Sequence, residues 1–189
     1  HPAVAAVSFT GSYTVGHAIY QQLAPRMARA QMEMGGKNPT IVLADADLDL
    51  AATLVARAGF GLTGQACTAT SRVIVDRSVA AAFTEKLVAK ARALKVGNGL
   101  AAGIDMGPAV SETQLLGNLK WVESAVAGGA KLVCGGRRLA NGDFAHGWFM
   151  EPTVLGDVTP SMPIACEEVF GPVIAIIAAE NFDDALRIA

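Results

Sequence analysis

A cysteine in a short glycine-containing segment is the first candidate for chemistry in this sequence. Cys67 lies in Gly64 to Thr68 (GQACT), just before an apolar stretch that is typical of a strand. A thiolate adds readily to a carbonyl carbon, so a cysteine placed at the start of a strand could act as a nucleophile. Taken alone, the same segment more often holds a small buried side chain.

Two further segments carry acidic side chains beside glycine. Glu33 stands just before the pair Gly35 and Gly36, and we expect it on irregular backbone, from which its carboxylate could reach a cleft as a general base. The segment Glu167 to Pro172 (EEVFGP) places two acids before an aromatic ring and a Gly-Pro turn, so it could hydrogen-bond a sugar and stack on a ring. Taken alone, each segment is more often a solvated surface turn.

The segment Phe9 to Gly16 (FTGSYTVG) could approach an anion. Gly11 follows an apolar stretch and Ser12 precedes a helical pattern. Glycine lets the backbone approach a ligand closely, and a helix N-terminus offers free N–H groups to an anion such as pyrophosphate. With only Gly11 and Gly16, the segment lacks the GxGxxG fingerprint. An ordinary strand–helix turn is equally consistent with this local pattern.

Alternating strand and helix patterns must position these segments. Apolar stretches predict strands over residues 4–9, 40–43, 71–75, 131–134 and 173–179. The last of these (VIAIIAA) is apolar at every position, as in a strand that is buried on both faces of a parallel sheet. Helical patterns fall between them, at residues 48–60, 78–94 and 111–128 among others. We therefore expect an α/β fold with a mainly parallel sheet flanked by helices.

Composition excludes several classes of protein. The 189 residues are 52% hydrophobic and carry a formal net charge of −2, which predicts a buried core and no basic surface for nucleic acid. No apolar stretch reaches the ~18 residues that cross a bilayer. The three cysteines include no close pair, which argues against a zinc site and for reduced thiols in the cytoplasm. We expect a soluble protein without a nucleic-acid or membrane partner.

In this order, the four segments resemble the motifs of the aldehyde dehydrogenase superfamily. FTGSYTVG resembles the family's cofactor turn, EMGGKNP (Glu33 to Pro39) its glutamate motif, GQACT its cysteine motif and EEVFGP its ribose-binding motif. The stretches at residues 106–111, 129–136 and 151–154 match the family as well. The resemblance therefore spans essentially the whole chain.

The resemblance implies a role for each candidate residue. Cys67 would add to an aldehyde as a thiohemiacetal that becomes a thioester, and Glu33 would activate the water that hydrolyses it. The hydride would pass to NAD or NADP. The residues implied in cofactor binding are Gly11, Ser12 and Gly16 at the pyrophosphate, the carbonyl of Met34 at the carboxamide, Glu168 at the nicotinamide ribose and Phe170 beside the nicotinamide. Lys37 and Asn38 match the motif, and we interpret both as structural.

The resemblance also bears on the substrate and leaves alternatives. Branches of the family that transfer the acyl group to coenzyme A need no hydrolytic base, so Glu33 favours release of a free carboxylic acid. The pattern at residues 59–75 resembles bacterial semialdehyde dehydrogenases, including those that act on 2-oxoglutarate semialdehyde. A non-catalytic structural or binding relative is the main alternative. A Cys–His hydrolase is a weaker one, because no motif links His1, His17 or His146 to Cys67.

The domain organisation follows from the same resemblance. Residues 1–37 are expected to be the C-terminal part of a Rossmann-like cofactor-binding domain, and residues 38–189 a catalytic domain that is incomplete at its C-terminal end. The chain would then be an internal fragment, inactive alone, of an enzyme that acts on a small-molecule aldehyde and forms a homo-oligomer at full length.

Overall fold

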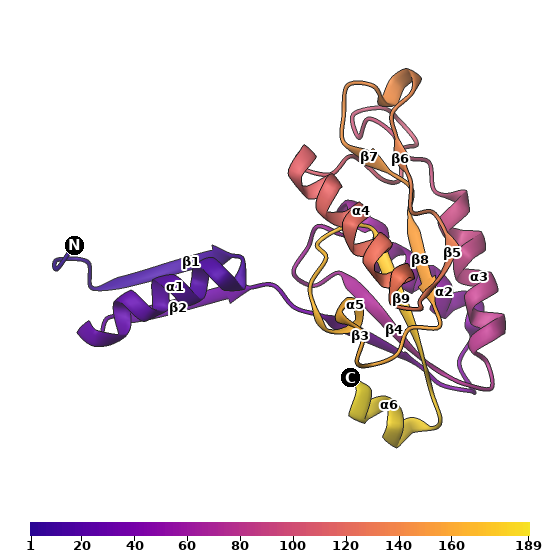
Figure 1. The fold of residues 1–189 in the computed structure, drawn as a ribbon, viewed down its shortest axis with the longest axis horizontal. Helices are drawn as coiled ribbons and strands as arrows, with labels where there is room; N and C mark the ends of the chain where they lie inside the picture. Colours follow the sequence, from indigo (N-terminus) through magenta and orange to yellow (C-terminus); the bar gives the residue numbers. More distant parts are fainter. The chain divides into compact units, whose positions relative to one another are not determined.

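A parallel βαβ element forms the first of two compact units in the structure. The computed structural model describes all of residues 1–189, and the chain divides into His1–Gly36 and Lys37–Ala189. In the first unit β1 (Ala6–Gly11) pairs in parallel with β2 (Arg29–Met34), and α1 (Tyr13–Leu23) with the short 3-10 helix η1 (Ala24–Arg26) connects them (Figure 1). Gly16 of α1 is buried, and a Cβ there would lie 2.5 Å from Sδ of Met34. The helix therefore packs closely on one face of the strand pair.

Strand β2 corrects one expectation from the sequence. Glu33 lies inside this strand and not on irregular backbone. The segment Arg29–Met34 (RAQMEM) alternates exposed polar side chains with partly buried apolar ones, which is the pattern of a strand with one covered face. Strand β1 is also displaced from the predicted residues 4–9 and ends at Gly11, so the glycine belongs to the strand and Ser12 begins the turn.

The second unit is built on a five-stranded sheet of order β3-β4-β9-β8-β5. Its strands are β3 (Asn38–Val42), β4 (Thr70–Asp76), β5 (Lys131–Cys134), β8 (Thr153–Gly156) and β9 (Val173–Ala179), and only β5 runs antiparallel to its neighbour. The predicted α/β fold with a mainly parallel sheet is confirmed.

Helices cover both faces of this sheet (Figure 1). On one face α2 (Leu48–Phe60) and α3 (Ala80–Ala93) form a core with Ile174 and Ile176 of β9. On the other face α4 (Glu112–Ala127) and α5 (Pro163–Cys166) pack with Val173, Ala175 and Ile177 of the same strand. Alternate residues of β9 thus enter two different cores, which explains why the strand is apolar at every position.

Shorter elements complete the second unit. They are η2 (Gly61–Gly64), the paired strands β6 (Arg138–Leu139) and β7 (Phe149–Met150) with η3 (Gly142–Phe144) between them, and the final helix α6 (Phe182–Ile188). The helices predicted at residues 48–60 and 111–128 are present as α2 and α4. Asp47, Ser111 and Asn181 are the N-caps of α2, α4 and α6. None of the helices combines the length and apolar character that crossing a membrane would require.

Candidate active site

Cys67 is exposed on the segment between η2 and β4. We call residues 62–69, which include the end of η2, the cysteine loop. Asn38, the first residue of β3, fixes this loop from the neighbouring strand. Its Nδ2 donates hydrogen bonds to the carbonyl oxygens of Cys67, at 2.6 Å, and of Ala69, at 3.1 Å. The edge of the sheet therefore holds the backbone that carries the thiol, and this contact is a structural role of the kind expected for Asn38.

The approach to Cys67 has an unusual backbone conformation. Leu62, Thr63 and Gly64 have φ values of 51°, 61° and 67°, three left-handed residues in succession. For a residue with a side chain this region costs roughly 1–2 kcal/mol, and it persists only where the surroundings enforce it. The buried hydroxyl of Thr63 donates to the carbonyl oxygen of Gly107 at 3.1 Å. The strained turn is thus tied to a distant segment of the chain.

Gln65 extends that connection to residues 107–110, which we call the bridging loop. Its Oε1 accepts a hydrogen bond from the backbone N–H of Val110 at 2.8 Å, and its Nε2 donates to the carbonyl oxygen of Pro108 at 3.3 Å. Both ends of the side-chain amide are used. The cysteine motif therefore contains, two residues before the thiol, a side chain that fixes the loop.

The segment EEVFGP forms a turn at residues 167–172, which we call the Phe170 turn. Phe170 has a φ of 55° and is 37% exposed. A Cβ on Gly64 would lie 2.2 Å from the carbonyl oxygen of Gly171, so the cysteine loop and the Phe170 turn touch through two glycines. Only residues without a side chain permit this approach. The structure therefore brings together two motifs that lie about a hundred residues apart in the sequence.

Lys37 contributes a buried cation beside these motifs. Its Nζ atom is buried and makes no hydrogen bond. Burial, reinforced by the nearby Arg72 guanidinium, lowers the pKa of Lys37 to about 8, while Glu168 acts in the opposite direction. Nε of Arg72 donates to the carbonyl oxygen of Lys37 at 2.9 Å and keeps the two cations close. The half-buried carboxylate of Glu168 therefore lies near an amine whose charged form is destabilised by burial.

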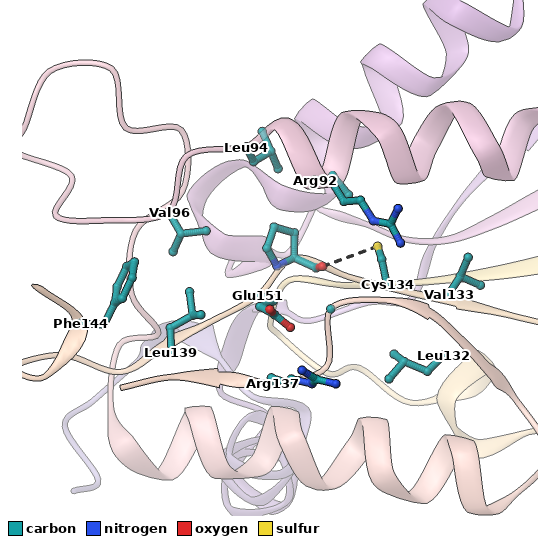
Figure 2. A pocket seen from close by; sticks show the side chains of 13 residues that line it. Arg92, Leu94, Val96, Leu132, Val133, Cys134, Arg137, Leu139, Phe144 and Glu151 are labelled. Carbon is teal, nitrogen blue, oxygen red and sulfur yellow. Dashed lines mark hydrogen bonds between the residues drawn. The ribbon is translucent and has the colours of Figure 1, made fainter. Parts of the chain in front are cut away.

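The other two cysteines occupy different environments. Cys134 lines a pocket of about 560 Å³ together with Arg92 and Glu151 (Figure 2). Its thiol is buried and lies 3.9 Å from the carbonyl oxygen of Pro152, and burial raises the pKa of this thiol. A thiol of raised pKa is a poor nucleophile at neutral pH. Cys166 is exposed.

The first unit carries the remaining predicted residues. Gly11 ends β1 and pairs with Met34 of β2, while Thr10 pairs with Glu33. Ser12 is the N-cap of α1, and its hydroxyl accepts a hydrogen bond from the backbone N–H of Val15. The strand pairing thus places the start of the FTGSYTVG turn beside the glutamate motif.

Glu33 projects from β2 on the side of the exposed residues. Its Oε1 accepts a hydrogen bond from Nε2 of Gln31 at 2.9 Å, and both side chains are exposed. On a regular strand alternate side chains point to the same face, so Glu33 lies on the exposed face with Gln31. The strand setting therefore suits a general base at least as well as the predicted one.

The start of α1 is open and could hold an anion such as a dinucleotide's pyrophosphate. Gly11 and Ser12 are exposed there, and the N–H groups of the first turn of a helix attract anions. Gly16 allows α1 to lie against β2. The sequence indicated these residues as candidates, but it did not indicate Thr63 or Gln114. The Thr63 hydroxyl donates to the carbonyl oxygen of Gly107, and Nε2 of Gln114 donates to the carbonyl oxygens of Val169 and Phe170. Such bonds between distant segments leave no local signal in the sequence.

Comparison with protein families gives one match over the whole chain. The model described as "Aldehyde dehydrogenase family" matches residues 1–189. The alpha-ketoglutaric semialdehyde dehydrogenase of Bacillus subtilis (strain 168) is 46% identical over 189 residues, which is 100% of this chain and 39% of that protein.

Solved structures agree with this match. The betaine aldehyde dehydrogenase of Staphylococcus aureus in complex with NAD+ is 36% identical, with a TM-score of 0.96 over 100% of this chain and 37% of that one. A 3,6-anhydro-L-galactose dehydrogenase in complex with NADP is 39% identical, with a TM-score of 0.97 over 100% of this chain and 40% of that one. The chain therefore spans about two fifths of the length of these relatives.

Proposed function

The chain belongs to the aldehyde dehydrogenase family, and on that premise we propose that it forms the catalytic segment of an NAD(P)-dependent enzyme that oxidises an aldehyde to a carboxylic acid. The observation that carries the proposal is the setting of Cys67. Its thiol is exposed, and the loop that bears it is held by Asn38, Thr63 and Gln65. A nucleophile needs both access to substrate and a fixed position.

Cys67 begins the proposed reaction by adding its sulfur to the aldehyde carbon, which gives a thiohemiacetal. The negative charge that develops on the former carbonyl oxygen requires a hydrogen-bond donor. The backbone N–H of Cys67 makes no hydrogen bond within the protein and is available for this purpose. Asn38 holds the carbonyl group of the same residue, which restrains the backbone of the loop at Cys67.

A nicotinamide cofactor, when bound, supplies the hydride acceptor that converts the thiohemiacetal to a thioester. We assign its pyrophosphate to the start of α1, at Gly11 and Ser12, with Gly16 allowing the helix to approach the strands. In the second unit, Glu168 would hydrogen-bond the ribose and Phe170 would pack beside the nicotinamide. The carbonyl of Met34 would accept a hydrogen bond from the carboxamide. Relatives solved with NAD+ and with NADP leave both cofactors open.

Glu33 completes the proposed cycle. Its carboxylate takes a proton from water, the resulting hydroxide attacks the thioester carbon, and the carboxylic acid leaves as the thiol of Cys67 re-forms. We further propose that residues 1–37 are the end of the cofactor-binding domain and residues 38–189 the larger part of the catalytic domain, a boundary one residue from the division between the two compact units.

For the substrate we propose a short acidic semialdehyde. The pattern around Cys67 and the name of the Bacillus subtilis relative both support this class. A simple aliphatic aldehyde that reacted as efficiently as 2-oxoglutarate semialdehyde would contradict the substrate proposal while leaving the reaction type intact.

A chimeric enzyme tests the reaction type. The 189 residues would replace the matching segment of the Bacillus subtilis relative, and NADH or NADPH formation would be followed at 340 nm with 2-oxoglutarate semialdehyde. We expect turnover that Cys67→Ala abolishes and Cys166→Ala does not. A folded chimera that binds cofactor without oxidising any aldehyde would instead support a non-catalytic binding relative.

A further inference from the structure

Three contacts connect the cysteine loop, the bridging loop and the Phe170 turn in a closed circuit, and Gln65 makes the first of them. The hydrogen bonds from its two amide ends to Pro108 and Val110 hold the bridging loop beside the cysteine loop. The hydroxyl of Thr63 adds a third hydrogen bond, to Gly107. Because the amide of Gln65 has its donor and its acceptor both engaged, the bridging loop is held in one orientation.

Gln114 makes the second contact, between the start of α4 and the Phe170 turn. The bridging loop runs directly into Ser111, the N-cap of α4, and the hydroxyl of Ser111 accepts a hydrogen bond from the backbone N–H of Gln114 at 3.2 Å. From the first turn of the helix, Nε2 of Gln114 donates to the carbonyl oxygens of Val169, at 3.0 Å, and Phe170, at 3.1 Å. Gln114 therefore ties the helix start to the Phe170 turn.

Gly64 and Gly171 make the third contact, between the cysteine loop and the Phe170 turn. The Phe170 turn returns to the cysteine loop where the carbonyl oxygen of Gly171 faces Gly64 at a distance that excludes a Cβ. Both joined segments contain left-handed residues, at Leu62 and Thr63 on one side and at Phe170 on the other. Such residues relax when their surroundings loosen. We therefore expect a shift in any one of these contacts to affect the others.

We propose that Gln65 and Gln114 are positioning residues, which fix the thiol of Cys67 and the phenyl group of Phe170 relative to each other. Both glutamines act through the backbone of the residues they hold. That this positioning serves aldehyde oxidation rests on the proposed function. The coupling that we propose between the cysteine loop and the Phe170 turn depends only on the fold, so it can be measured without that function.

Amide hydrogen exchange tests the coupling in the protein itself. Gln114→Met keeps the length of the side chain and removes the Nε2 donor, which bonds Val169, Phe170 and also the side chain of the buried Asn118. Gln21→Met, at an exposed glutamine of α1, is the matched control. Losing one hydrogen bond weakens local structure by about tenfold in its opening equilibrium. Because the variant loses more than one hydrogen bond, we expect Gln114→Met to raise exchange by tenfold or more both in the Phe170 turn and at residues 65–69. A rise confined to the Phe170 turn would overturn the proposal.

A second variant covers the case in which Gln114→Met does not fold. Gln65→Met perturbs the contact with the bridging loop, and the proposal predicts faster exchange in the Phe170 turn, to which the Gln65 side chain makes no hydrogen bond. Unchanged exchange in that turn, with faster exchange only at residues 107–110 and in the cysteine loop, would equally overturn the coupling.

Kinetics in the chimeric enzyme separate positioning from a purely structural role. A displacement of about 1 Å in an active site can reduce the rate by about 100-fold. We expect Gln114→Met to lower kcat by tenfold or more, to leave the KM for aldehyde nearly unchanged and to increase the isotope effect with deuterated aldehyde. An active parent whose Gln114→Met variant keeps the kcat of the Gln21→Met control would refute the inference. A folded but inactive parent would refute the proposed function alone, because the exchange result would still decide the coupling.

Discussion

Replacing Lys37 by methionine should stabilise the protein at neutral pH, although the lysine belongs to the glutamate motif. Nζ of Lys37 is buried without a hydrogen-bond partner, and burial together with the Arg72 guanidinium lowers the pKa of this amine from 10.5 to about 8. One pKa unit corresponds to about 1.4 kcal/mol, so keeping the proton at pH 7 costs the folded state up to about 3 kcal/mol. Methionine has a similar length and carries no charge.

The pH dependence gives the sign of the effect. Below pH 8 the amine is charged in both the folded and the unfolded state, and the cost of burial is fully present. Between about pH 8 and 10.5 the folded state has released its proton and the unfolded state has not, so the free energy of unfolding rises with pH through this range. The advantage of Lys37→Met over the native protein should therefore be largest near pH 7 and fall towards zero by pH 10.5.

Urea unfolding at pH 7, 8.5 and 10, followed by tryptophan fluorescence, measures this difference. Both tryptophans, Trp121 and Trp148, lie in Lys37–Ala189, so the signal reports the unit that contains Lys37. Lys120→Met, at an exposed lysine of α4, is the matched control and should show no comparable trend. A Lys37→Met variant that is less stable than the native protein at pH 7, or whose advantage does not shrink as pH rises, would refute the reasoning.

Three other substitutions or modifications test the site. Gly64→Ala should lower the free energy of unfolding by about 3 kcal/mol or more, because the new Cβ meets the Gly171 carbonyl and the φ of this residue is positive. In the same urea titration the control Gly61→Ala should change the free energy of unfolding little, because its Cβ meets open space. Asn38→Ala should cost about 1–2 kcal/mol by leaving the carbonyl groups of the cysteine loop without their donor, and unchanged stability and amide exchange there would contradict that role. Iodoacetamide should label Cys67 and Cys166 in the folded protein but Cys134 only after unfolding, and peptide mass spectrometry would show any departure from this order.

Local patterns in the sequence predicted much of the second unit. Helix α2 occupies the predicted residues 48–60, because Asp47 caps it and its apolar positions recur at helical spacing. The strand at residues 173–179 was recognisable because every position is apolar. These signals are local, since they depend only on neighbours in the chain.

Strand β2 was predictable in principle but was missed. Its alternating RAQMEM pattern is that of a half-covered strand, yet the Gly35–Gly36 pair beside it drew the interpretation towards an irregular loop. As a result Glu33 was identified as a candidate residue in the wrong backbone setting. Its role as a base stays a prediction.

The contacts that organise the site are not local, and the sequence alone did not indicate them. Ser111 caps α4 with its hydroxyl, which accepts a hydrogen bond from the backbone N–H of Gln114. The side chain of Gln114 instead reaches carbonyl groups 55 and 56 residues away. The same holds for Gly64 and Gly171, whose close approach depends on how the whole sheet is assembled.

The most direct test of the central claim is to trap the thioester on Cys67. In the chimeric enzyme carrying Glu33→Gln, one turnover with NAD or NADP and 2-oxoglutarate semialdehyde should form a burst of reduced cofactor and then stall. Peptide mass spectrometry should then find the peptide containing Cys67 heavier by the acyl group. Steady turnover with an unmodified Cys67, or an acyl group on a different residue, would contradict the account.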